Sequence, residues 1–148
     1  MAIKFDKNIS PIPLIPVRVG KNNNTVYAMI DTGSEISLFD YGIIGSLDVL
    51  TKESNQYELH MMSMLGEKRD ESPKIAKAVL HPVGSEEKGF EMIGALSDLS
   101  SLSEYFRGTY KKDVYISILI GSDVLSDNKA IIDYLENKIN FCDTSRKQ

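Results

Sequence analysis

The chain has 148 residues, of which 42% are hydrophobic and 26% charged, with a formal net charge of −4 at pH 7 and one cysteine. This composition fits a globular domain and excludes a collagen-like, disordered or disulfide-rich chain. The negative charge gives no electrostatic reason to expect nucleic acid or an anionic membrane as a partner.

The apolar runs of the chain are short. None approaches the roughly 20 residues of a membrane-spanning helix, and the first residues lack the apolar core of a signal peptide. We therefore expect a cytoplasmic protein with no membrane partner. The length predicts a single domain over residues 1–148, with a core at about 12–141 and a polar tail at 143–148.

The first element expected is a β-hairpin. Residues 12–20 predict a strand, which Pro13 and Pro16 should confine to an edge or to irregular pairing, because proline cannot donate to a ladder. The Asn-rich residues 21–24 predict a turn. Residues 25–30 then predict the returning strand, which ends directly at Asp31.

The middle of the chain is less regular. Residues 57–64 predict a strand that leads to a turn near Gly66. Residues 72–80 fit two structures equally. Ser72 as a cap and Pro73 in the first turn favour a helix, whereas Pro73 at the start of a strand would suit the return of a hairpin.

A strand and a helix are expected next. Residues 90–95 predict a short strand. Apolar residues at spacings of three to four then predict a helix over residues 97–107, with Ser97 as its cap.

The last third of the chain is strongly apolar. Residues 114–120 predict a buried strand, followed by Gly121 and a short helical turn in which Asp123 should cap the helix start. Residues 130–141 predict a closing hairpin around residues 136–137. Short strands separated by turns indicate a mainly β barrel or sandwich.

One tetrapeptide carries chemistry: Asp31, Thr32, Gly33 and Ser34, directly after an apolar strand. A carboxylate can act as a base toward water, and a second, protonated carboxyl can polarise a carbonyl. Two carboxyls in contact share one proton, because two negative charges so close together repel each other and only one of the carboxyls ionises. Gly33 would leave room for water or substrate and permit an unusual backbone conformation, and the hydroxyls of Thr32 and Ser34 could orient the carboxylate.

The motif resembles the active-site loop of retropepsins, the single-lobe aspartic proteases. Residues 118–125, which run from aliphatic residues through Gly121 to a short helix, resemble the second landmark of that family. Residues 130–141 resemble its closing hairpin. The likeness spans about residues 12–141.

The resemblance implies a mainly β, closed barrel-like fold with one or two short helices, and an aspartic endopeptidase that works as a homodimer. Each subunit would supply Asp31, Thr32 would grip the partner's loop, and Gly33 and Ser34 would support the catalytic pair. The partners implied are a second copy and a peptide or protein substrate. No cofactor, metal or nucleic acid is implied.

Two further features follow from the resemblance. A flap over the substrate would correspond to residues 61–70, with contacts from Met64, Leu65 and Gly66. Ser122 stands where many members carry an arginine that ties the helix to the active-site loop. The alternatives are a catalytically inactive module of the same fold, which dimerises or binds peptides, and a monomer with half a site.

Overall fold

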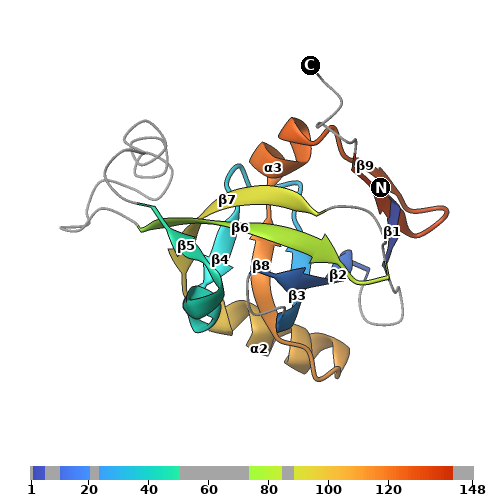
Figure 1. Cartoon of the computed structure of the whole chain (residues 1–148). Helices are drawn as coiled ribbons and strands as arrows, with labels where there is room; N and C mark the ends of the chain where they lie inside the picture. The colour runs from blue at the N-terminus through green and yellow to red at the C-terminus, as the bar shows by residue number, and fades with distance from the viewer. Residues whose placement is uncertain (1, 6–10, 21–23, 51–73, 85–88, 142–148) are drawn as a thin grey trace, which may run out of the picture.

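Strands dominate the computed structural model of the chain (Figure 1), which describes residues 2–5, 11–20, 24–50, 74–84 and 89–141. The first half contains β1 (Ala2–Lys4), β2 (Leu14–Val19), β3 (Asn24–Ile30), β4 (Leu38–Asp40), the 3-10 helix η1 (Tyr41–Ser46) and β5 (Asp48–Val49). The second half contains β6 (Ile75–Pro82), β7 (Phe90–Ser97), α2 (Ser100–Tyr110), β8 (Ile116–Ile120), α3 (Ser122–Asp127), β9 (Ile131–Asp133) and β10 (Lys138–Asn140). The strand predicted at 57–64 and its turn lie outside the described residues.

Six strands close into a barrel. Their order is β2, β3, β8, β4, β7, β6, and a pairing of β6 with β2 completes the ring. The pairs β3–β8 and β4–β7 are parallel, whereas the other pairs in the ring are antiparallel. The mainly β, closed barrel-like fold predicted from the sequence is confirmed.

The hairpin of β2 and β3 is confirmed, but β2 is not an edge strand. It pairs with β3 along its whole length and with β6 over its last three residues. The carbonyl of Pro16 accepts from the Val83 amide at 3.0 Å, one step beyond the final β2–β6 pair. Because the amide and carbonyl of one strand residue face the same neighbour, the N–H that Pro16 lacks would face Val83, at the last hydrogen bond between the two strands and outside their paired residues.

The segment that the sequence left ambiguous contains strand β6. Its residues Ala76, Ala78 and Leu80 are buried, and Lys77 and Val79 between them are more exposed. This period of two is that of a strand with one face in the core. Six residue pairs join β6 to β7, so cross-strand pairing decides the conformation here.

The expected helix exists, but it begins later than predicted and Ser97 does not cap it. Strand β7 continues through Ser97, and the N-cap of α2 is Leu99, which makes no side-chain capping bond. Instead the Leu99 amide donates to Asp40 at 2.7 Å, and the Ser100 amide donates to Asp98 at 2.9 Å. The first amides of α2 are thus satisfied partly by a distant strand end.

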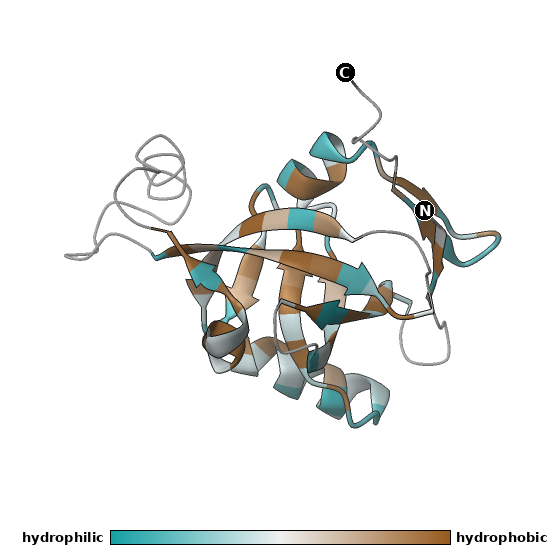
Figure 2. Ribbon diagram, viewed as in Figure 1, coloured by the Kyte–Doolittle hydropathy of each residue, from teal (hydrophilic) through white to brown (hydrophobic). Residues whose placement is uncertain are grey.

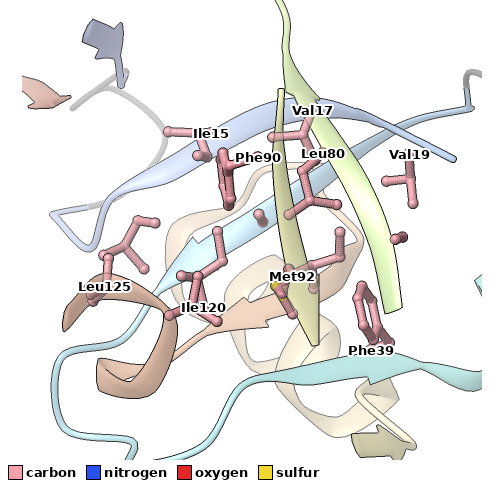
Figure 3. Close-up of a cluster of buried hydrophobic side chains, with 14 of the residues drawn as sticks. Ile15, Val17, Val19, Phe39, Leu80, Phe90, Met92, Ile120 and Leu125 are labelled. Carbon is pink, nitrogen blue, oxygen red and sulfur yellow. The ribbon is translucent and has the colours of Figure 1, made fainter. Parts of the chain in front are cut away.

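Apolar side chains fill both the barrel and the space under α2. Figure 2 shows the apolar residues concentrated on the barrel strands, and Figure 3 shows side chains from β2, β4, β6, β7, β8 and α3 meeting inside. A second cluster joins Phe106 of α2 to Leu14, Met29 and Leu119 on the outer face. Because β8 contributes to both clusters, it is apolar at nearly every position.

A small sheet of order β1, β10, β9 packs against the barrel. It confirms the predicted closing hairpin and adds β1, which precedes residue 12 and was not expected. Ile3 and Phe5 are buried in the same cluster as the barrel residues, and Phe90 stacks on Phe141 at 4.6 Å. Within the described ranges, no helix combines the length and apolarity needed to cross a bilayer.

Candidate active site

Asp31 follows the last residue of β3, beside the end of β8. The two strands are parallel, with Ile30 opposite Ile120, so they deliver the residues that follow to one edge of the barrel (Figure 1). The Asp31 amide donates to the Ile120 carbonyl at 2.9 Å and so extends the ladder by one bond. The structure therefore brings together the two sequence landmarks, which are far apart in the chain.

The Asp31 carboxylate is held by its own turn. Its Oδ1 accepts from the Gly33 amide at 3.0 Å, and the Asp31 carbonyl accepts from the Ser34 amide at 3.2 Å. Asp31 is half-buried, whereas Thr32 and Gly33 are exposed. The turn therefore presents the carboxylate at the surface of the chain, where a second molecule can reach it.

Gly33 acts through its missing side chain rather than through an unusual backbone. Its φ is not in the left-handed region, unlike those of Gly20 and Gly84. A Cβ at Gly33 would lie 3.3 Å from Asp31 Oδ1, tighter than most contacts of this kind. The glycine therefore keeps the space beside the carboxylate clear.

The Ser34 side chain braces the turn and does not bond to the carboxylate. Its hydroxyl donates to the Ile36 carbonyl at 2.7 Å, and its own carbonyl accepts from the Ser122 amide at 2.7 Å. The sequence predicted that the Ser34 hydroxyl could orient the carboxylate, whereas the hydroxyl holds the backbone of the turn instead. Thr32 is exposed in the single chain. Its hydrogen bonds to a partner's loop stay a prediction.

Gly121, at the end of β8, is in close contact with the active-site turn. A Cβ there would lie 2.5 Å from the Ile36 carbonyl oxygen and 2.7 Å from that of Ser34. Both neighbours are backbone atoms, so a side chain at this position would push the turn away. The glycine of the second landmark is thus explained by close approach.

Asp123 is not the N-cap of α3, which is Gly121, but it does satisfy a first-turn amide of the helix, since its Oδ1 accepts from the Val124 amide at 2.8 Å. The Asp123 carboxylate also accepts from the Ser37 hydroxyl at 2.6 Å and from the Ser37 amide at 3.2 Å. Ser37 was missed because nothing local marks it; its partner lies 86 residues away. This contact joins the helix to the loop.

The predicted flap, residues 61–70 with Met64, Leu65 and Gly66, lies outside the described residues.

A hollow of about 260 Å³ lies between α2, β8 and η1. Its lining includes Asp40, Arg107 and Tyr115, and no residue of the Asp31 turn. Arg107 lies over the Tyr115 ring at 4.4 Å. Among the described residues, no group of three or more His, Cys, Asp or Glu side chains is placed to hold a metal ion.

Comparison with known proteins gives structural likenesses only. No family model matches the chain, and no curated protein sequence matches it. Among solved structures it is similar to the retroviral protease-like domain of Ddi1 from Leishmania major, with 14% identity, 88% of this chain and 87% of that chain covered, and a TM-score of 0.48.

Two further structures are similar. One is a retropepsin-like aspartic protease from Rickettsia conorii, with 16% identity, 94% and 85% of the chains covered, and a TM-score of 0.41. The other is EIAV protease in complex with the inhibitor HBY-793, with 12% identity, 86% and 98% covered, and a TM-score of 0.44. These neighbours are retropepsin-like proteases, the family that the sequence resembles. At these identities and TM-scores, their activities do not transfer to the chain.

Proposed function

We propose that the chain is an aspartic-type endopeptidase that works as a homodimer, in which Asp31 of each of two chains forms the catalytic pair. One observation carries the proposal: a braced turn at the end of β3 presents a single carboxylate beside exposed Thr32 and Gly33. A two-fold axis through this turn would place Asp31 against its own copy, because such interfaces are self-complementary.

The chemistry follows from two carboxyls that share one proton. The ionised carboxyl takes a proton from water while the protonated one gives its proton to the peptide carbonyl oxygen, so the water adds to the carbonyl carbon. The carboxyl that took the proton from water then passes it to the peptide nitrogen, the C–N bond breaks, and the other carboxyl regains its proton from the carbon-bound hydroxyl as the new acid forms. The substrate would lie extended and pair with the cleft as an added strand. We propose that Met64, Leu65 and Gly66 contact the substrate from the flap. We also propose that the protein is located in the cytoplasm.

The test compares Asp31→Asn with Asp98→Asn in the full chain. Asp98 is a matched control, because its carboxylate also accepts the amide of the residue two positions later. Both proteins are incubated with a mixture of peptides and denatured proteins, and the products are identified by mass spectrometry. We expect Asp31→Asn to lose about 100-fold or more of the cleavage rate, and Asp98→Asn to retain it.

Two further measurements complete the test. Activity per chain should rise with protein concentration near the dimer dissociation constant, because a lone chain holds half a site. A pepstatin-type inhibitor should block cleavage. If the Asp31→Asn protein cleaved peptides at the wild-type rate, the proposal would be refuted. If the wild-type protein bound peptides but never cleaved them, the inactive module would be favoured instead.

A further inference from the structure

The Ser37 side chain is the centre of a buried hydrogen-bond network behind the active-site turn. Ser37 is fully buried, with no exposed surface. Its hydroxyl oxygen accepts from the Gly121 amide at 2.8 Å, and the hydroxyl donates to Asp123 Oδ1 at 2.6 Å. Its backbone amide donates to Asp123 Oδ2 at 3.2 Å. One serine thus connects the loop after Asp31 to both the end of β8 and the start of α3.

The direction of these bonds requires an acceptor at position 123, and a carboxylate suits it. Because the Gly121 amide can only donate, the Ser37 hydroxyl must send its own proton elsewhere. The Ser37 amide is a second donor that faces the same side chain. The two Ser37 donors reach different oxygens, Oδ1 and Oδ2, and Oδ1 also accepts from the Val124 amide at 2.8 Å, so a carboxylate, which accepts through both oxygens, satisfies all three donors in this geometry.

The same network fixes the segment that carries Asp31. Ser34 and Ser37 lie three and six residues after it, and both are tied to residues 121–123. Asp31 itself is tied to Ile120. In this set of contacts, Asp123 alone supplies a charged side chain, so a single substitution can weaken the bracing while the barrel strands stay intact.

We propose that Asp123 is a positioning residue for Asp31, acting through Ser37 to hold the turn in the conformation that presents the carboxylate. This inference rests on the proposed peptidase function. A displacement of about 1 Å can cost about 100-fold in rate, so weaker bracing should lower kcat per active site. Substrate affinity should change little, because neither residue is exposed at the turn's surface.

The experiment measures kcat and KM for Asp123→Asn, Ser37→Ala and the double variant in the full chain. An amide at position 123 can accept from one Ser37 donor, but it turns its NH2 group toward the other. Active sites are counted by titration with a pepstatin-type inhibitor, so unfolded protein does not enter kcat. Ser37→Ala removes only a hydroxyl and serves if Asp123→Asn fails to fold.

The matched control is Asp40→Asn. The two oxygens of Asp40 also accept two backbone amides, those of Leu99 and Gly42, at 2.7 and 2.8 Å. These bonds brace the start of α2 and of η1, not the Asp31 turn. Asp40→Asn should therefore lower stability while leaving kcat per titrated site unchanged.

We expect each single variant at Asp123 or Ser37 to lower kcat by about tenfold or more, with KM within about twofold of wild type. In the double variant, kcat should decrease by a factor smaller than the product of the two single decreases, because both substitutions act on one contact. Wild-type kcat in Asp123→Asn, or equal losses in Asp40→Asn, would overturn the inference while the peptidase function stands.

Hydrogen exchange separates failure of this inference from failure of the function. If the wild-type chain cleaves nothing, the peptidase proposal fails, but the bracing can still be measured. Asp123→Asn should then speed exchange of the Asp31 and Ser34 amides, and not that of Ile116 in β8. Unchanged exchange at Asp31 and Ser34 would refute the bracing itself.

Discussion

Gly121→Ala should destabilise the chain and disable the active-site turn, although alanine is otherwise a conservative change. The backbone at Gly121 is extended, with φ −94° and ψ −175°, so alanine can adopt it. The conflict is purely one of space. The added Cβ would lie 2.5 Å from the Ile36 carbonyl oxygen, where ordinary contact begins at 3.4 Å.

The size of the effect follows from what must move. The Ile36 carbonyl has to retreat by roughly 0.9 Å, and overpacking of this kind costs about 1–3 kcal/mol. The bonds from Ser122 to Ser34 and from Gly121 to Ser37 span the same gap. Loss of one would cost about 1 kcal/mol more, so we expect a decrease of about 2–4 kcal/mol in the free energy of unfolding.

Urea unfolding at one fixed protein concentration measures this, because a dimer would make stability concentration-dependent. The control is Gly108→Ala. Gly108 lies inside α2 with open space around its Cβ position, so alanine there should stabilise by about 0.5–1 kcal/mol. Equal midpoints for Gly121→Ala and wild type would refute the close-approach explanation.

Two predictions concern parts of the chain away from the site. Ser103→Ala should lower the free energy of unfolding by about 1–3 kcal/mol, because it leaves the buried Ile116 amide without the acceptor that it now has at 2.8 Å. Calorimetry should show no such loss for exposed Ser101→Ala on the same helix. The Ser100 side chain, and then its backbone amide, hold the pKa of Asp98 below 3.8 by hydrogen bonding. Because the folded-state pKa is lowered, this stabilisation is present above pH 3.8 and is lost as the pH falls through the folded pKa. An NMR titration of Ser100→Ala should give a higher pKa for Asp98, and an unchanged value would contradict the assignment.

The elements that the sequence predicted well are those whose signals are local. The β2–β3 hairpin, β8, α3 and the β9–β10 hairpin each follow from apolar runs bounded by turn residues. Asp31 and Gly121 were found for the same reason, since each lies at the end of a strong strand. Their proximity depends on the parallel pairing of β3 with β8, which the sequence analysis did not predict.

The features that sequence reasoning missed depend on partners far along the chain. Strand β1 has few strand signals of its own and forms by pairing with β10. The start of α2 is set partly by Asp40, 59 residues earlier, so Ser97 looked like a cap but lies in a strand. Asp123 was predicted to cap the helix, and it does accept the Val124 amide in the first turn, but its two bonds from Ser37, 86 residues away, could not be predicted locally.

The parallel pair of β3 and β8 explains why the Asp31 motif alone is not a site. Within the turn there are two hydrogen bonds: the Ser34 amide donates to the Asp31 carbonyl, and the Gly33 amide donates to the Asp31 carboxylate. These two bonds alone would hold four small residues only weakly. Parallel strands end at the same edge, so β8 delivers its own terminal residues to the back of that turn. Residues 120–123 then supply the bonds that the turn cannot make for itself. A transplanted Asp-Thr-Gly-Ser turn without a glycine and an acceptor at the facing strand end should therefore leave its carboxylate loosely held.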